Sequence, residues 1–299
     1  MSVIDISHVT KDYGQGRGVF DISFTVEQGE VLGFLGPNGA GKTTTIRQLM
    51  GFIRPDSGSL SVQGMDCFKE TDQIQKSLGY LPGEIAFIDS MSGMEFIHFV
   101  AKMKKMKDLG RANELMEMFD LNASGKLKKM SKGMKQKIGI VCAFMNQDAS
   151  ILVLDEPTSG LDPLMQNRFV ELVLSEKKRG KTILMSSHMF EEIERTCDRA
   201  AIIRDGRIVT VEEMEKLKEG RKKIIEVTFK EAVMAEAFAA EFPKASYQAG
   251  GKRVTAEVGR DLDSFVKKAG DFTVIDLEVR AQSLEEFFMH FYGEEADKS

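Results

Sequence analysis

The sequence is poor in cysteine and has no long hydrophobic run, and these two features limit the classes of protein to which it can belong. Its 299 residues include three cysteines, Cys67, Cys142 and Cys197. An odd number set far apart argues against a disulfide framework or a zinc site and fits a reducing cytoplasm. The most apolar stretch, residues 138–145, is much shorter than the roughly 20 residues of a membrane-spanning helix. Residues 1–8 alternate like a strand and lack the regions of a signal peptide.

The chain also lacks an excess of positive charge. Its formal net charge is −5 and its pI is about 5.6, with Lys and Arg spread along the sequence. Because nucleic-acid binding needs a basic face, we do not expect nucleic acid to be the main partner. The length allows one large and one small domain.

A glycine-rich segment is the most informative part of the sequence. Residues 36–43 read Gly-Pro-Asn-Gly-Ala-Gly-Lys-Thr and fit the phosphate-loop pattern G-x-x-x-x-G-K-[ST] at every fixed position. The apolar run at residues 31–35 predicts a buried strand before it, and residues 44–50 predict a helix that ends at Gly51. In a strand, loop and helix of this kind, backbone N–H groups converge on a polyphosphate.

Different residues of this segment would bind different parts of a nucleoside triphosphate and its metal ion. Lys42 would reach the β- and γ-phosphates, and the hydroxyl of Thr43 would bind Mg²⁺. The candidate ATP-binding residues of the segment are Gly36, Pro37, Asn38, Gly39, Ala40, Gly41, Lys42, Thr43 and Thr44.

Three further polar residues follow predicted buried strands. Asp155 and Glu156 come directly after the apolar run at residues 151–154, and His188 follows a second run at residues 182–187. In an open α/β sheet, ligands bind at the carboxyl edge of the strands. We therefore expect Asp155 to hold Mg²⁺, Glu156 to polarise an attacking water, and His188 to contact the γ-phosphate.

With these motifs, residues 1 to about 215 resemble the ATP-binding subunits of ABC transporters. The resemblance implies an α/β P-loop NTPase of ABC type, with a mixed sheet core, an antiparallel β subdomain and a helical subdomain at about residues 84–148. Residues 216–299 contain strand and helix patterns of their own, which predict a small C-terminal α+β domain. Its last helix would begin at Ser283, with Glu286 as the partner in a capping box.

The resemblance assigns further site residues. Tyr13 lies where the family stacks an aromatic ring on adenine, and Asp162 lies in the D-loop. Glu156 and His188 would be catalytic, and Thr43 and Asp155 would bind Mg²⁺. The signature motif, which meets the ATP of the opposite subunit, corresponds to Ser131, Lys132, Gly133 and Met134.

Two motifs depart from the family pattern. The signature is usually Leu-Ser-Gly-Gly-Gln, so Lys132 and Met134 are unusual. Lys132 would either add positive charge near the phosphate or point to solvent. The family generally has Gln after the proline at position 82, where this chain has Gly83. Glu84, one residue further, is the candidate replacement as a metal ligand.

The same variants, together with the C-terminal Ser-Leu-Glu-Glu-Phe-Phe segment, resemble the ATPases of ABC-2-type exporters of Gram-positive bacteria that expel antimicrobial or amphipathic peptides. The resemblance implies an ATP hydrolase that powers export through a separate transmembrane permease subunit, at the cytoplasmic face of the membrane. ATP would close a dimer, formed by two copies or with a related ATPase chain, and hydrolysis would reopen it. Residues 84–100, rich in apolar side chains, would contact the permease.

Two other functions fit less well. A soluble ABC-type ATPase acting on nucleic acid or ribosomes usually carries two ATPase units or a long coiled coil, and the sequence shows neither an internal repeat nor sustained heptads. A GTPase switch would need an Asn-Lys-x-Asp motif, which the sequence lacks.

Overall fold

The computed structural model describes residues 1–219, 222–242, 245–258, 262–283 and 286. The chain divides into two compact units, Met1–Met214 and Glu215–Ser299. The boundary expected from the sequence lay after residue 215. Within the described residues, no helix is long and apolar enough to cross a membrane.

A four-stranded antiparallel sheet occupies the start of the first unit. Its strands, in spatial order, are β2 (Gly18–Glu27), β1 (Ser2–Asp12), β4 (Ser57–Val62) and β5 (Met65–Asp66). Apolar side chains alternate along β1 and β2, so that Ile4, Ile6 and Ile22 enter the core while their neighbours face outward. This sheet is the antiparallel β subdomain that the family resemblance implies.

A six-stranded sheet forms the centre of the first unit. Its order is β10 (Arg207–Glu213), β9 (Arg199–Arg204), β3 (Val31–Leu35), β8 (Thr182–Ser187), β7 (Ile151–Asp155) and β6 (Leu78–Leu81). All neighbouring strands are parallel except β10, which pairs antiparallel with β9. Every residue of β3, β7 and β8 is buried, as their continuous apolar runs predict. The carboxyl ends of these three strands therefore meet at one edge.

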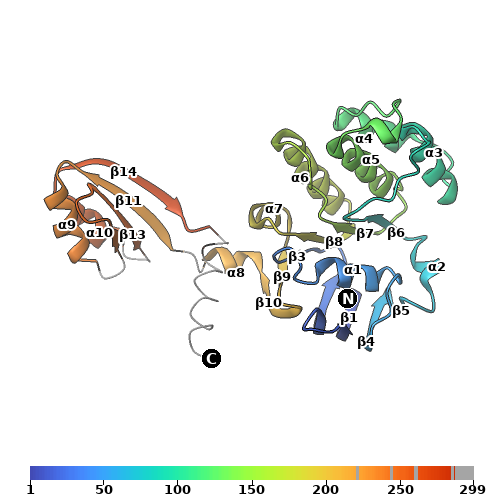
Figure 1. Cartoon of the computed structure of the whole chain (residues 1–299), viewed down its shortest axis with the longest axis horizontal. Helices are drawn as coiled ribbons and strands as arrows, with labels where there is room; N and C mark the ends of the chain where they lie inside the picture. The colour runs from blue at the N-terminus through green and yellow to red at the C-terminus, as the bar shows by residue number, and fades with distance from the viewer. Residues whose placement is uncertain (220–221, 243–244, 259–261, 284–285, 287–299) are drawn as a thin grey trace. The chain divides into compact units, whose positions relative to one another are not determined.

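Helices complete the first unit (Figure 1). They are α1 (Lys42–Leu49), α2 (Thr71–Ile74), α3 (Gly93–Met103), α4 (Gly110–Met118), the 3₁₀ turn η1 (Leu127–Lys129), α5 (Lys132–Phe144), α6 (Pro163–Lys178) and α7 (Phe190–Thr196). A further helix, α8 (Met214–Glu219), begins at the last residue of this unit. Figure 1 shows α3, α4 and α5 gathered beyond the β6 edge of the sheet. They form the expected helical subdomain, and the predicted fold class is confirmed.

The second unit has the β-α-β-β-α-β order of a ferredoxin-like fold. Its elements are β11 (Lys223–Phe229), α9 (Ala232–Ala240), β12 (Ala245–Tyr247), β13 (Arg253–Val258), α10 (Leu262–Ala269) and β14 (Val274–Ala281). The sheet order is β12-β13-β11-β14, with every pair antiparallel. Sequence analysis predicted an α+β domain but not this topology, because the three-residue strand β12 gives too weak a local pattern.

An aromatic cluster holds the second unit together. Phe238 on α9 is fully buried, and its ring centroid lies 4.9 Å from that of Phe229 on β11 and 5.5 Å from that of Phe265 on α10. Both helices therefore pack on the same face of the sheet. Ser283 and Glu286 make the two hydrogen bonds of the predicted capping box, at 2.9 and 3.0 Å. The rest of the predicted last helix lies outside the described residues.

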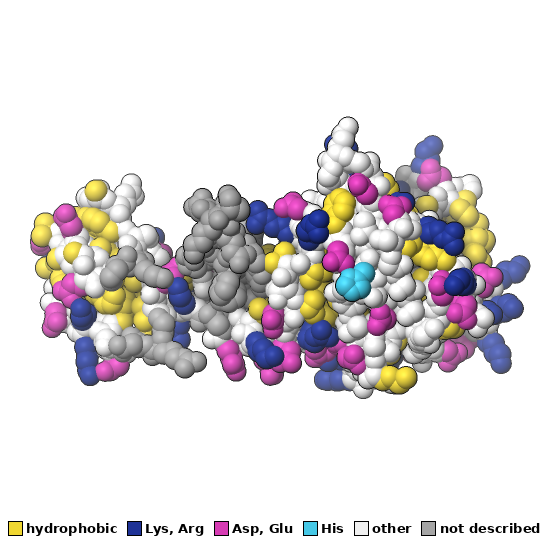
Figure 2. Space-filling model, turned by 90° about the horizontal axis from the view of Figure 1, so that it is seen from below, with side chains coloured by type: hydrophobic (Ala, Val, Ile, Leu, Met, Phe, Trp, Pro, Cys, Tyr) yellow, Lys and Arg dark blue, Asp and Glu magenta, His cyan; other side chains and the backbone are white. Residues whose placement is uncertain are grey.

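Basic and acidic side chains are interspersed on the face of the molecule that Figure 2 shows. Ion pairs at the protein surface include Lys69 with Asp66 and Lys267 with Asp263. Exposed pairs of this kind contribute about 0–1 kcal/mol each. The stability of both units therefore depends mainly on their apolar cores.

We expect Phe238→Ala to destabilise the second unit by about 3–5 kcal/mol, because it removes the ring at the centre of the aromatic cluster. Calorimetry with and without MgATP would separate the two units, since ATP raises only the transition of the unit that binds it. Val233→Ala on the same helix is the control, because Val233 is 73% exposed. An equal effect of the two substitutions would contradict this account of the core.

Candidate nucleotide-binding site

The phosphate loop runs from the carboxyl end of β3 to the first residue of α1. Gly36 lies so close to β9 that a Cβ atom would be 2.3 Å from the carbonyl oxygen of Ile203, so only glycine fits. Gly41 has a φ of 111° and is the N-cap of α1, where no side chain caps the helix. The N–H groups of the first turn of α1 are therefore available to an anion, as the sequence predicts.

The ammonium of Lys42 is buried at the base of this loop. Its side chain is 5% exposed, and Nζ donates to the carbonyl oxygens of Gly36 at 2.6 Å and Pro37 at 3.2 Å. Nζ also lies 3.1 Å from Oε1 of Glu156. A buried ammonium needs hydrogen-bond acceptors or a negative charge close to it. Phosphate oxygens provide both, and so they can replace the carboxylate of Glu156 at Lys42.

Glu156 is held in an unusual backbone conformation beside Lys42. Its φ is +48°, in the left-handed region that non-glycine residues seldom occupy. The backbone N–H of Glu156 donates to Oγ of Ser186 at 3.0 Å, and Oε2 lies 2.6 Å from Nδ1 of His188. The structure thus brings together Lys42, Glu156 and His188, which come from three separate parts of the sequence.

Asp155 is fully buried at the end of β7. Its Oδ1 accepts a hydrogen bond from Oγ of Ser186 at 2.5 Å, whereas Oδ2 has no hydrogen-bond partner among the described residues. A Cβ atom on Gly83 would lie 2.9 Å from Oδ2, so the glycine leaves the space beside this oxygen open. An unpartnered buried carboxylate oxygen fits a bound cation, and Thr43 is the second predicted ligand.

A cavity of about 500 Å³ joins the phosphate loop, Lys42 and Glu156 to the protein surface. Its lining residues are Tyr13, Gly16, Arg17, Gly18, Asn38, Gly39, Gly41, Lys42, Thr43, Thr44, Glu156, Asp205 and Gly206. The predicted adenine-stacking residue Tyr13 is in this set and is 54% exposed. Sequence analysis missed Arg17 and did not place the Asp205–Gly206 turn here. That turn reaches the site because the N–H of Gly206 donates to the carbonyl of Ala40 at 3.1 Å.

The signature and D-loop residues do not line this cavity. Ser131 is the N-cap of α5 and accepts from the N–H of Met134 at 3.2 Å, and Asp162 is the N-cap of α6. Lys132 donates to Oγ of Ser159 at 2.9 Å, so its ammonium is bonded within its own chain.

The candidate metal ligand Glu84 also lies apart from the nucleotide cavity. It is exposed and lines a different pocket, together with Arg47 and Tyr80. Its neighbour Gly83 lies beside Oδ2 of Asp155, so the role of Glu84 as a metal ligand stays a prediction.

Comparison with known proteins shows which family the chain belongs to. Residues 19–159 match the family model described as ABC transporter. The bacitracin transport ATP-binding protein BcrA of Bacillus licheniformis is 32% identical over 301 residues, which is 98% of each chain. The chain belongs to the family of ABC transporter ATP-binding proteins. It is an ATP-binding subunit of an ABC transporter.

Other relatives match a smaller share of this ABC transporter subunit. The linearmycin resistance ATP-binding protein LnrL of Bacillus subtilis is 36% identical over 214 residues, 70% of this chain and 68% of that protein. A solved ATP-binding subunit of an ABC transporter has a TM-score of 0.65 at 28% identity and covers 73% of this chain and 92% of that one. The dimeric bacterial cassette MJ0796 has a TM-score of 0.64 at 22% identity, covering 71% of this chain and 98% of that one, and shares the fold. The match to BcrA, by contrast, includes the second unit.

A buried acid supports the segment that carries His188. Glu192 on α7 is 5% exposed, and its Oε2 accepts from Oγ of Ser187 at 2.6 Å. Burial raises the pKa of Glu192 from its usual 4.5 to about 7, although the hydrogen bond from Ser187 lowers it. Between these two pH values the folded protein binds more protons than the unfolded chain, so stability falls as the pH rises.

We expect Glu192→Gln to remove this pH dependence. Relative to the parent, the free energy of unfolding of the variant should rise by about 1–3 kcal/mol between pH 5 and pH 8. Urea unfolding at both pH values measures this difference. Glu191→Gln, at a neighbouring side chain that is 79% exposed, should show no such rise. A pH-independent difference for Glu192→Gln would refute the proposed cause.

Proposed function

We propose that this subunit hydrolyses Mg-ATP to power export through a separate membrane permease. The observation that carries the proposal is the contact of the Glu156 carboxylate with both Lys42 and His188, beside the phosphate loop. A carboxylate at this point is within reach of a water that attacks the γ-phosphate. The second oxygen of Asp155, which has no partner, supports Mg²⁺ as the cofactor, with Thr43 as the other ligand.

In the proposed reaction, the first turn of α1 and Lys42 bind the phosphates, and Lys42 gives up its contact with Glu156. The oxygen of the attacking water bonds to the γ-phosphorus, and Glu156 accepts the proton that this water loses. The bond between the γ-phosphorus and the oxygen that bridges it to the β-phosphate breaks. His188 orients the carboxylate through Nδ1 and contacts the γ-phosphate. Thr43 and Asp155 would hold Mg²⁺, which when bound would neutralise charge on the phosphates.

A dimer is part of the proposal. Ser131 and Gly133 lie outside their own chain's cavity, which supports a role at the ATP of an opposite subunit. Two copies of this chain, or this chain with a related ATPase, would then hold each ATP between a phosphate loop and a signature motif.

The names of relatives support an exported peptide or drug-like amphipath as cargo. BcrA is a bacitracin transport protein, and LnrL is a linearmycin resistance protein. Because the cargo would pass through the permease, this subunit would act from the cytoplasmic face of the membrane and would not itself select the cargo.

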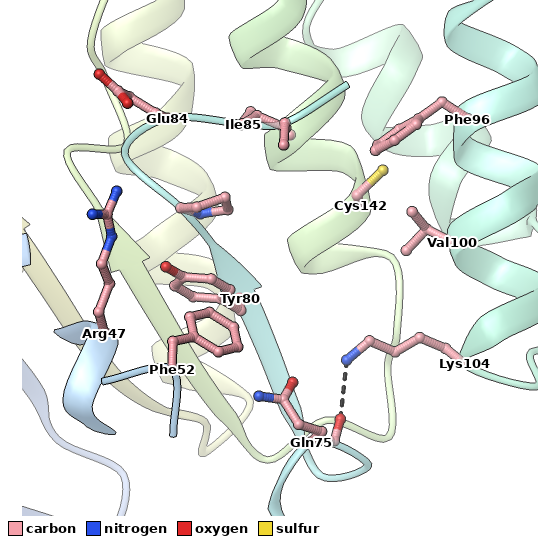
Figure 3. Close-up of a pocket in the computed structure, with 13 residues that line it drawn as sticks. Arg47, Phe52, Gln75, Tyr80, Glu84, Ile85, Phe96, Val100, Lys104 and Cys142 are labelled. Atoms are coloured by element: carbon pink, nitrogen blue, oxygen red, sulfur yellow. Dashed lines mark hydrogen bonds between the residues drawn. The ribbon is translucent and has the colours of Figure 1, made fainter. Parts of the chain in front are cut away.

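A second pocket, of about 480 Å³, is the proposed contact site for the permease. Figure 3 shows Phe52 and Tyr80 side by side on one wall and Val100 on the opposite wall. Lys104 closes one end and donates to the backbone carbonyls of Gln75 and Leu78, at 3.1 and 2.6 Å. The pocket includes part of residues 84–100, the region predicted from the sequence to contact the permease, together with residues after α1.

Phe52→Asp should uncouple transport from ATP binding. Phe52 is 60% exposed on this pocket, so a carboxylate there repels an apolar partner segment without disturbing the core. Phe87 is a poorer probe, because its ring packs at 4.9 Å from that of Phe96. We expect Phe52→Asp to bind nucleotide as the parent does but to lose co-purification with the permease. The control is Val233→Asp, a substitution at an exposed residue, which should change neither measurement. Loss of ATP binding with normal permease binding would refute the assignment.

Glu156→Gln should lower turnover by about 10²–10⁴-fold while ATP still binds, because the amide keeps the size of the side chain but not its basicity. Unhydrolysed ATP should then hold the dimer closed, as gel filtration with and without Mg-ATP would detect, alone or with the natural partner chain. Lys42→Ala should instead weaken ATP binding itself. Hydrolysis by Glu156→Gln at the parent rate would exclude Glu156 as the general base.

A further inference from the structure

Helix α5 is hydrogen-bonded through Gln136 to the backbone at Glu156 and Pro157. Gln136 is 5% exposed, and its Nε2 donates to the carbonyl oxygen of Pro157 at 2.8 Å and lies 3.4 Å from that of Glu156. These two carbonyls belong to the residues that set the direction of the Glu156 side chain. A buried amide that donates to backbone in this way fixes one segment against the other.

Lys132 makes a second link between the same two segments. Its Nζ donates to Oγ of Ser159, and its methylene groups lie over Gly160, where a Cβ atom would be 3.1 Å from Cγ and Cδ of the lysine. A Cβ atom on Gly133 would be 2.8 Å from the carbonyl oxygen of Gly160. The first turn of α5 and the loop that follows Glu156 are therefore in direct contact, with no side chain between their backbones at this point.

The backbone of Glu156 depends on such support. A non-glycine residue at a φ of +48° is strained and persists only where its surroundings determine its conformation. Besides Gln136, the groups that hold it are Oγ of Ser186 on its N–H and the N–H of Ser159, which donates to its carbonyl at 3.2 Å. One of these supports, Gln136, comes from the helix that begins with the signature motif.

We propose that Gln136 and Lys132 are positioning residues that couple the signature motif of a subunit to its own general base, Glu156. This inference rests on the proposed dimeric ATPase. In that dimer, the signature motif of one chain contacts the ATP of the other chain. When this contact forms, a small displacement of α5 would be transmitted through Gln136 and Lys132 to the loop of residues 156–160. Hydrolysis at one site would thereby depend on occupancy of the other.

Two substitutions remove the links with little change in shape. Gln136→Met keeps the length of the side chain but removes the donor to Pro157. Lys132→Met keeps the methylene groups over Gly160 but removes the ammonium. Since a misplacement of about 1 Å can cost about a hundredfold in rate, we expect each variant to lower kcat at least about tenfold. The ATP affinity of the isolated chain should be unchanged, because neither residue lines its nucleotide cavity.

The measurement is the ATPase rate against ATP concentration, for the parent and each variant in its natural assembly. We expect a sigmoidal dependence for the parent and a hyperbolic one for both variants, a change of shape that a general loss of folded protein does not produce. Lys132→Arg keeps a donor and should recover the sigmoidal dependence. Lys129→Met, which removes a neighbouring exposed charge from η1, should behave as the parent.

Parent kcat and cooperativity in Gln136→Met would overturn the inference, as would equal impairment of Lys132→Arg and Lys132→Met. If Gln136→Met does not fold, the two variants of Lys132, whose side chain is at the surface, still decide the question. If the parent itself hydrolyses no ATP in its natural assembly, the proposed function fails, and the coupling fails with it. A parent that hydrolyses ATP without cooperativity would overturn the coupling alone.

Discussion

The buried ammonium of Lys42 is the constraint on which the site depends. A charge this well shielded from water must have oxygen partners, and in this structure it has two loop carbonyls and the carboxylate of Glu156. These partners hold the loop around the lysine. In the proposed reaction, phosphate oxygens replace the carboxylate at Lys42, and Glu156 is then available to accept a proton from water. Phosphate binding and release of the proposed base would therefore be a single step.

The sheet determines how these groups reach each other. Five parallel strands put the ends of β3, β7 and β8 side by side, so the loop, the acid pair and His188 share one edge although they are far apart in the sequence. Ser186 shows how closely this edge is organised. Its hydroxyl donates to Asp155 and accepts from the N–H of Glu156, and so connects a predicted metal ligand to the proposed general base.

The departures from the family pattern have structural counterparts. Gly83 leaves open the space beside the free oxygen of Asp155, where the family's glutamine side chain would start. Lys132 crosses Gly160 and reaches Ser159, which adds a charged link where the usual glycine has no side chain. One change lies beside Asp155 and the other contacts the loop that follows Glu156, whereas Asp155 and Glu156 themselves match the family pattern.

The sequence alone determined the family, the fold class and the residues at the strand ends. These features are local: continuous apolar runs specify buried parallel strands, and the glycine pattern specifies the phosphate loop, whatever surrounds them. The partner of Lys132, the position of Glu84 and the approach of the Asp205–Gly206 turn to Ala40 became clear only in the tertiary structure. Each of these joins segments far apart in the chain, and which of several possible neighbours a side chain meets is decided by how helices and strands pack. The short strand β12 was missed for the same reason, because its conformation is fixed by pairing with β13 and not by its own three residues.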